Sequence, residues 1–270
     1  MSVPFFNLAP NLTVSRLCLG TMTFGEQNSL PQSFRLLDEV FHAGINFFDS
    51  AEMYPVPQRA ETQGRSEEYL GRWIRERKIP RDRVVLATKV TGPSGQMIWI
   101  RGGPKHLDAK NITEAIDNSL QRMQMEYIDL YQIHWPDRYV PMFGETEYHP
   151  TQQFCSISIE EQLDALGRAV DAGKVRYIGL SNETPYGIMK FLQLAERLGR
   201  YSEGESRYNL SNNMVKAATM GYLDIARKHG LHPVSLAIAF VLRHPLVAST
   251  IFGATRSWQL RRLSMVARLS

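Results

Sequence analysis

The segments FDSAEMY (residues 48–54), LATK (86–89) and YQIHW (131–135) each contain or follow an apolar run that ends in polar or titratable residues. Short apolar runs bounded by turns are typical of buried strands in a parallel sheet. In a barrel of alternating strands and helices, the carboxyl ends of successive strands meet at one rim, where such folds build active sites. We therefore predict that four side chains at or just beyond these strand ends share one site. They are Asp49, Tyr54, Lys89 and His134.

Strand and helix patterns alternate on both sides of these segments. A small hairpin is predicted for Phe5–Leu8 and Leu12–Ser15. The predicted parallel strands are Leu17–Gly20, Ile45–Phe48, Val84–Ala87, Ile128–Ile133 and Val175–Leu180. Apolar residues at helical spacing predict helices between them, around Phe34–Phe41, over Ser66–Arg77, from a capping box at Asn111 and Glu114 to Met123, and over Ile159–Ala172. Further helices are predicted at Met214–Lys228 and Pro233–Arg243. This alternation implies a barrel or a doubly wound sheet.

Composition limits the class of protein. The chain has 270 residues, 43% hydrophobic and 21% charged, which fits a single α/β domain over residues 1–270. A net charge of +4 is compatible with a phosphorylated ligand but is too diffuse to indicate nucleic-acid binding. No apolar run approaches the roughly 20 residues of a membrane-spanning helix. With only Cys18 and Cys155 as cysteines and no signal-like N-terminus, we predict a cytoplasmic protein.

Several common ligand motifs are missing from the sequence. It contains no G-x-G-x-x-G string, no Walker motif and no H-E-x-x-H, and its histidines show no metal-ligand spacing, so we expect no metal. Barrels commonly bind phosphates near the loops after their last two strands. The stretch Gly253-Ala254-Thr255-Arg256 follows the apolar run Val247–Phe252 at such a place.

The four rim residues Asp49, Tyr54, Lys89 and His134 resemble the catalytic tetrad of the aldo-keto reductase family. The strings GTMTFGEQ at 20–27 and GLSN at 179–182 resemble the same family. The resemblance covers residues 14–199 almost continuously and returns over 214–260, up to FGATRSWQL. It implies a (β/α)8 TIM barrel that reduces an aldehyde or ketone to an alcohol with NADPH. The implied partner is a small carbonyl substrate, and the oligomeric state stays open.

Carbonyl reduction by hydride leaves negative charge on oxygen, so an acid must supply a proton. Tyr54 is the candidate acid. A free phenol has a pKa of about 10, and a nearby ammonium, that of Lys89, favours proton release. Asp49 is placed to hold Lys89 protonated, and His134 to donate a hydrogen bond to the carbonyl oxygen. Trp135 is predicted to line the substrate pocket.

The resemblance also implies residues that hold the cofactor. Gly20, Thr21 and Met22 correspond to the loop beneath it, and Asp49, Ser181 and Asn182 to the nicotinamide end. The residues implied at the adenosine end and its 2′-phosphate are Gly253, Thr255, Arg256 and Gln259. Leu263 stands where the family has an asparagine, which is a departure from the pattern.

The stretch from the fifth strand to the eighth is too short. At roughly 31 residues per unit it should hold about 90 residues, but Asn182 to Gly253 spans fewer. The sixth strand, with its glutamine, and the seventh, with its stacking aromatic, have no counterpart. We therefore expect an incomplete barrel of about six parallel strands, an internal deletion near 199–213, and a shortened C-terminus, because Arg261–Ser270 resembles only the start of the final helix.

The four rim residues do not by themselves require an enzyme. Taken singly, each could have a structural role, such as a turn cap, a solvated strand end or a core histidine. The shortened chain could also be a catalytically inactive truncated or splice-variant fragment, or a nucleotide-binding regulatory subunit. The occurrence of all four at consecutive strand ends favours the enzyme.

Overall fold

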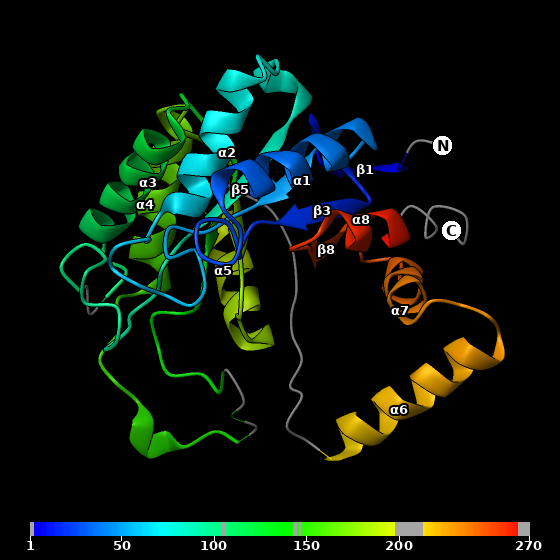
Figure 1. Cartoon of the computed structure of the whole chain (residues 1–270). Coiled ribbons are helices and arrows are strands. Elements are labelled where there is room, and N and C mark those ends of the chain that lie inside the picture. The colour runs from blue at the N-terminus through cyan, green and yellow to red at the C-terminus, as the bar shows by residue number, and fades with distance from the viewer. Residues whose placement is uncertain (1–2, 104–105, 143–144, 146, 198–212, 264–270) are drawn as a thin grey trace.

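The structure is a computed structural model that describes residues 3–103, 106–142, 145, 147–197 and 213–263. Its centre is a six-stranded sheet of order β7-β6-β5-β4-β3-β8, in which all neighbouring strands are parallel (Figure 1). The strands are β3 (Leu17–Gly20), β4 (Phe47–Asp49), β5 (Val85–Val90), β6 (Ile128–Ile133), β7 (Val175–Leu180) and β8 (Thr250–Gly253). The prediction of an incomplete barrel with six parallel strands is confirmed.

Helices follow the strands along the chain, and all but the sixth of them pack on the outer face of the sheet. They are α1 (Leu30–His42), α2 (Arg65–Glu76), α3 (Ala109–Met123), α4 (Ile159–Asp171), α5 (Pro185–Arg197), α6 (Asn213–Lys228), α7 (Pro233–Leu242) and α8 (Ser257–Leu263). Two short 3-10 turns lie at Arg81–Arg83 and Pro150–Gln152. Helices α1 to α5 pack side by side in sequence, whereas α6 extends away from the sheet and contacts α7 (Figure 1). Within the described residues, no helix has both the length and the apolar character needed to cross a membrane.

The start of α3 differs from the prediction of a capping box at Asn111. The N-cap is Asp108, whose side chain accepts a hydrogen bond from the Asn111 backbone N–H at 2.7 Å. Asp108 satisfies this amide, so the helix begins earlier than Asn111. A capping box does occur at α1, where the Gln32 side chain accepts from the Ser29 backbone N–H.

Successive side chains of each strand point to opposite faces of the sheet, and this alternation produces two separate apolar layers. Outward-facing side chains such as Leu19, Phe48 and Leu86 are fully buried against the helices. Inward-facing side chains such as Phe47 and Val85 form a smaller cluster. The same alternation carries Asp49 and Lys89 to the inner face, above this cluster.

The N-terminal hairpin of β1 (Phe5–Ala9) and β2 (Leu12–Ser15) closes the inner cluster from below. Its apolar residues Leu12 and Val14 pack against the inner face of the sheet. Asn46, just before β4, accepts a hydrogen bond from Ser15 N and donates to Thr13 O. The amino ends of the strands are therefore covered, and the carboxyl ends form the open rim.

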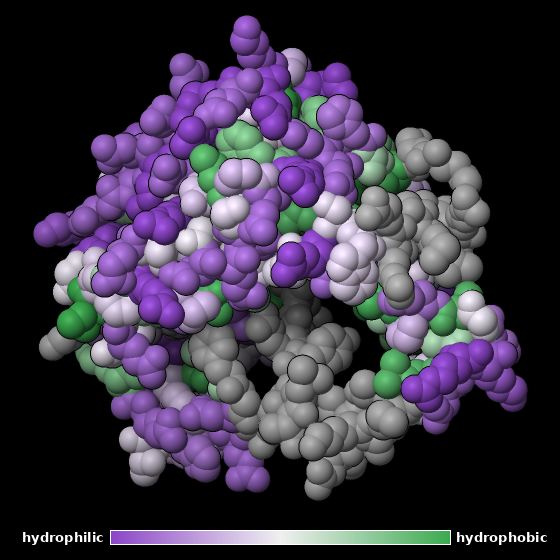
Figure 2. Space-filling model, viewed as in Figure 1, coloured by the Kyte–Doolittle hydropathy of each residue, from purple (hydrophilic) through white to green (hydrophobic). Residues whose placement is uncertain are grey.

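The sheet has two open edges, β7 and β8. β8 pairs with β3 as the last strand of a closed barrel would, but no strand of the described residues lies between β8 and β7. On the inner face of β8, Ile251 is 54% exposed. Figure 2 shows the molecule hollowed between the main body and α6–α7, with apolar side chains along the border near α7. The predicted deletion at 199–213 and the end of the chain from residue 264 lie outside the described residues, except for Asn213.

A charged anchor joins α1 to α2. The Asp38 carboxylate accepts bidentate hydrogen bonds from the Arg77 guanidinium, the shortest of them 2.9 Å long. It also accepts a hydrogen bond of 2.8 Å from the Trp73 indole N–H. Burial raises the pKa of Asp38, but the hydrogen bonds from Arg77 and Trp73 outweigh burial and lower it. This carboxylate therefore stabilises the fold only while it is ionised.

We predict that Asp38→Asn lowers the stability at neutral pH and that the loss disappears in acid. A carboxyl whose folded-state pKa is lowered contributes stability above its unfolded pKa of about 3.9 and loses it as the pH falls through the folded value. Urea unfolding of parent and variant between neutral and acid pH measures the difference. Asp164→Asn, in an exposed pair with Arg168, is the matched control. A pH-independent difference for Asp38→Asn would contradict this role.

Candidate active site at the rim of the sheet

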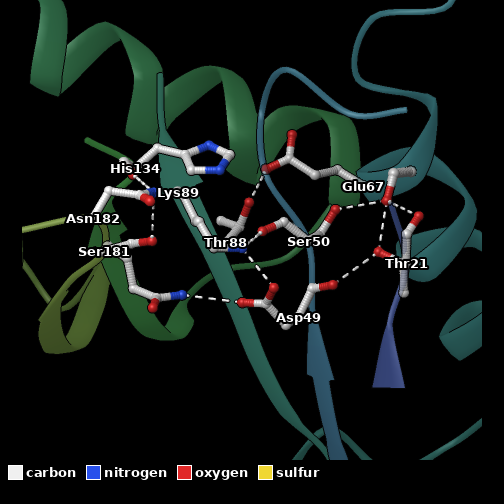
Figure 3. Close-up of polar contacts among 11 residues, drawn as sticks. Thr21, Asp49, Ser50, Glu67, Thr88, Lys89, His134, Ser181 and Asn182 are labelled. Carbon is white, nitrogen blue, oxygen red and sulfur yellow. Dashed lines mark hydrogen bonds and ion pairs between the residues drawn. The ribbon is translucent and has the colours of Figure 1, made fainter. Parts of the chain in front are cut away.

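The carboxyl ends of β4, β5 and β6 bring the predicted catalytic side chains together. In the strand register Asp49 lies beside Ala87, and Lys89 lies beside Gln132. Tyr54 lies in the loop after β4, and His134 directly follows β6. Figure 3 shows Lys89 pointing between Asp49 and Ser50, with His134 on the other side of the lysine.

Lys89 makes the central contact of the site. Its Nζ lies 2.5 Å from Asp49 Oδ2 and donates to the Ser50 carbonyl at 2.7 Å. Both side chains are only 7% exposed. Burial by itself lowers the pKa of Lys89, but the attraction of Asp49, with a contribution from Tyr54, outweighs burial and raises the pKa above its ordinary value. The charged form of the lysine is therefore favoured within the rim.

Gln132 is a further member that the sequence analysis missed. Its Nε2 donates to Asp49 Oδ1 at 3.1 Å, so the two carboxylate oxygens are held by two different strands. The signal for it was its position two residues before His134, which places both on the inner face of β6. Gln132 thus fixes the orientation of the carboxylate that holds Lys89.

Tyr54 and His134 lie next to the lysine. Their rings meet edge to face with centroids 5.6 Å apart, and Lys89 Nζ lies 5.2 Å from the centre of the Tyr54 ring. The Tyr54 backbone is held by hydrogen bonds to Ala51 O and from Gly64 N. The phenol ring, the ammonium and the imidazole therefore lie together at the rim of the sheet.

A network of hydroxyl groups supports this arrangement from behind. Thr21 is fully buried, and its Oγ1 donates to Asp49 O at 3.0 Å and contacts Ser66 Oγ at 2.6 Å. Ser66 also contacts Ser50 Oγ at 2.7 Å. The side chain of Thr21, predicted to be in a cofactor loop, therefore faces the protein, while Met22 beside it is 44% exposed.

Trp135 forms part of the wall of the site. Its ring lies 4.9 Å from that of His134, and its Nε1 donates to Pro93 O at 3.0 Å. Together with Met53 and Ile100 it belongs to a small apolar cluster separate from the main core. This cluster gives the site an apolar side next to its charged one.

Ser181 and Asn182 lie at the end of β7, where the sequence predicted the nicotinamide end of the cofactor. Asn182 Nδ2 donates to His134 O at 2.7 Å and to Ser181 Oγ at 3.1 Å, and Asn182 has a φ of 55°. Ser181 N donates to Ile133 O. Both residues are thus fixed beside His134 at the same rim (Figure 3).

The residues predicted for the adenosine end lie after β8. Gly20 and Gly253 are paired in the register of β3 and β8, and Asn28 donates to Thr255 O at 3.0 Å. Gln259 Oε1 accepts from the backbone N–H groups of Thr255 and Arg256, so its amide oxygen organises this loop. A cavity of about 70 Å³ lies here. It is lined by Gln32, Arg35, Leu36, Thr255, Arg256 and Ser257.

Arg35 was not identified from the sequence. It is an exposed residue of α1 and lines this cavity together with Arg256, so two arginines from distant segments border one small space. Such a pair suits a phosphate group. In the part of the chain that the structure describes, no cluster of three or more His, Cys, Asp or Glu side chains could hold a metal ion.

Comparison with known proteins identifies the family of the chain. Residues 16–216 match the model of the Aldo/keto reductase family. The chain therefore belongs to the aldo/keto reductase family, and the resemblance in its sequence is confirmed. Members of this family are (β/α)8 barrels and oxidoreductases that act on small carbonyl compounds and generally bind NAD(P)H.

Three relatives show how far the similarity extends. Protein Tas of Escherichia coli strain K12 is 39% identical over 308 aligned positions, which cover 93% of this chain and 89% of Tas. The uncharacterized oxidoreductase YrpG of Bacillus subtilis is 34% identical over 83% of this chain and 62% of its own length. A probable voltage-gated potassium channel subunit beta of Oryza sativa is 29% identical, and the alignment covers 92% of this chain and 86% of the rice protein. The alignment with Tas has more positions than this chain has residues, so Tas contains residues without a counterpart here.

We predict that Lys89→Met destabilises the protein by about 3–5 kcal/mol, because it leaves the buried Asp49 carboxylate without its partner. The double variant Asp49→Asn, Lys89→Met should recover most of this loss. Urea unfolding measures both. Lys174→Met, whose partner Asp117 is exposed, is the control and should cost less than about 1 kcal/mol. Equal losses in Lys89→Met and Lys174→Met would show that Asp49 is not a buried charge.

Proposed function

We propose that this chain reduces a small aldehyde or ketone to an alcohol with NADPH, taking the proton from Tyr54. The observation that carries the proposal is the buried, charged Lys89 held by Asp49 directly beside the Tyr54 ring and opposite His134. A bound nicotinamide would supply the hydride. The chain itself must orient the carbonyl, exclude water and deliver the proton.

Tyr54 is the group that gives up the proton. As the carbonyl oxygen gains negative charge, the phenol hydrogen-bonds to it and transfers its proton in the transition state. The Lys89 ammonium, 5.2 Å from the ring centre, stabilises the phenolate that remains. His134 orients the same oxygen, and Trp135 with Met53 provides an apolar wall for the rest of the substrate.

Asp49 has two tasks in this proposal. Its Oδ2 keeps Lys89 charged, and its other oxygen, held by Gln132, fixes the direction of the pair. Because Asp49 also lies next to Gly20 in the sheet register, it is proposed to contact the nicotinamide end as well. Ser181 and Asn182, fixed beside His134, are proposed to bind the carboxamide of that ring.

The residues after β8 fit the adenosine end of NADPH. The cavity between Arg35 and Arg256 offers two cations for a 2′-phosphate, and the Gln259 amide holds the loop that carries Thr255 and Arg256. Gly253 and Met22 are proposed to complete the cofactor site at the same rim. This pair of arginines is the reason to prefer NADPH over NADH.

We further propose that the chain is a single domain with an internal deletion near 199–213. The alignment with Tas, longer than this chain, supports the deletion, as does the space between edge strands β7 and β8. One wall of the cofactor site is then missing. Lost stacking and lost pyrophosphate hydrogen bonds would each remove on the order of 1–3 kcal/mol, so activity is proposed to be impaired.

A second candidate function is a nucleotide-binding regulatory subunit. It is favoured by the 29% identity to a rice protein named as a probable voltage-gated potassium channel subunit beta. Such a chain would bind NADPH with little turnover. A third possibility, an inactive fragment, would neither bind nor turn over. Calorimetric titration of NADPH and an aldehyde turnover assay together separate the three.

We predict that Tyr54→Phe lowers the turnover of an aldehyde at least about a hundredfold while NADPH affinity changes less than about twofold. The hydroxyl acts only on the substrate oxygen in the transition state, so cofactor binding does not need it. Stopped assays and calorimetric titration give the two values. Tyr222→Phe, on the exposed side of α6, is the control and should behave as the parent. Turnover by Tyr54→Phe at the parental rate would exclude Tyr54 as the acid.

We predict that NADPH binds to this chain about a hundredfold more weakly than to a family member with a complete barrel, because the missing wall costs roughly 3 kcal/mol. Arg256→Met should weaken the affinity for NADPH about tenfold further and leave the affinity for NADH unchanged, since only NADPH carries the 2′-phosphate. Arg243→Met, at the end of α7, is the control. Equal effects of Arg256→Met on both cofactors would remove the phosphate role, and submicromolar NADPH binding would show that the site is complete.

A further inference from the structure

A second buried ion pair lies beside the site, and the proton transfer described above does not use it. Glu52, in the loop after β4, contacts Arg101, in the loop after β5, and their side chains are 1% and 2% exposed. Glu52 lies two residues before Tyr54, and its backbone N–H donates to Lys89 O at 3.1 Å. The pair therefore joins the backbone that carries the catalytic groups to a second loop.

The contacts of this pair tie together two points of the second loop, Thr91 at its start and Arg101 itself. Glu52 Oε1 accepts from the Thr91 backbone N–H at 2.5 Å and from Arg101 Nη1. Arg101 Nη2 donates in turn to Thr91 O at 3.2 Å. Thr91 opens the loop and Arg101 lies ten residues later, so one carboxylate and one guanidinium hold residues 91–101 as a closed turn.

The residues enclosed by this turn include part of the apolar wall. Ile100, next to Arg101, is 3% exposed and packs with Met53 and Trp135, while Met97 and Tyr54 pack against the same cluster. The turn is tight, since Ile100 N donates to Met97 O at 3.2 Å and Gly103 N donates to Ile100 O at 2.8 Å. The position of Ile100 against Trp135 therefore depends on where Arg101 is held.

The backbone around Arg101 is unfavourable without its contacts. Arg101 has a φ of 45° and Gly103 a φ of 75°, both in the left-handed region. A Cβ at Gly103 would lie 3.1 Å from Ile98 Cα, so only glycine fits there without displacing the turn. A non-glycine residue in this region persists where surrounding contacts hold it, and at Arg101 these are the contacts to Glu52 and Thr91, with a longer one of 3.5 Å to Asn111 Oδ1.

We propose that the Glu52–Arg101 pair is a positioning device that sets residues 91–103 as the substrate-facing wall and thereby determines the affinity for the carbonyl substrate. This inference rests on the proposed reductase function. Buried ion pairs contribute little net stability compared with apolar replacements, whereas they fix one geometry. The pair therefore acts on substrate binding through Ile100 and Trp135, and it contacts neither the reacting oxygen nor the cofactor.

The first test measures the hydrogen exchange of the loop itself and does not require the protein to turn over a substrate. The variants are Arg101→Met, which leaves Glu52 unpaired, and the double variant Glu52→Gln, Arg101→Met, which leaves no buried charge and keeps an acceptor for Thr91 N. Hydrogen exchange of peptides covering residues 91–103 should become about tenfold faster in both. The melting temperature should fall in the single variant and recover in the double variant.

The matched control is Arg122→Met, which breaks the buried pair with Glu67 between α3 and α2, on the helix-covered face of the sheet. It should lower the melting temperature and leave exchange at 91–103 unchanged. Exchange that rises equally in Arg122→Met, or that returns to the parental rate in the double variant, would overturn the proposal and make the pair a purely stabilising contact.

The second test separates substrate binding from the chemical step. With benzaldehyde as the probe, the double variant should raise KM about tenfold, equivalent to about 1.4 kcal/mol, while kcat and the dissociation constant of NADPH change less than about twofold. A parental KM, or a loss confined to kcat or to NADPH affinity, would overturn the proposal. A parent chain without turnover would defeat the proposed function instead, and the exchange measurement would then decide the role of the pair by itself.

Discussion

The buried contact between Lys89 and Asp49 is the constraint on which the rest of the site depends. Two charges taken out of water are tolerated only with close geometry and further hydrogen bonds, and here the Ser50 carbonyl and the Gln132 amide supply them. These partners come from three neighbouring strands or strand ends. The order and register of β4, β5 and β6 are therefore tied to the chemistry of the rim, because a slip of one residue would turn Lys89 to the outer face.

This constraint also explains how a site can persist in an open sheet. The groups that surround Lys89 lie on strands β4 and β6 or in the segments that directly follow them, and these strands are held by helices on the outer face and by the N-terminal hairpin below. The open edges lie at β7 and β8, so exposed apolar side chains such as Ile251 gather on the opposite side. The side of the sheet that carries Lys89 is therefore well supported, and the side proposed to hold the middle of the cofactor is the open one.

Buried charge recurs around the sheet in two different settings. Glu67 and Arg122 join α2 to α3 and reach Thr88 on the outer face of β5, where they support packing. Glu52 and Arg101 lie at the rim and join two loops. The same chemistry thus serves helix packing in one place and loop placement in the other, because Glu67 lies on a helix against the outer face of β5, whereas Glu52 lies in a loop at the carboxyl ends of the strands.

The sequence by itself determined the alternation of strands and helices, the number of parallel strands, and the four rim residues, because burial periodicity and strand ends are local properties. It misplaced the start of α3, since a side chain three residues upstream captured the Asn111 amide. Only the tertiary structure decided that Gln132 holds Asp49, that Arg35 faces the same cavity as Arg256, and that Glu52 pairs with Arg101. These partners are 49 to 221 positions apart in the chain, and no local pattern of residues specifies which distant side chains meet once the strands are in register.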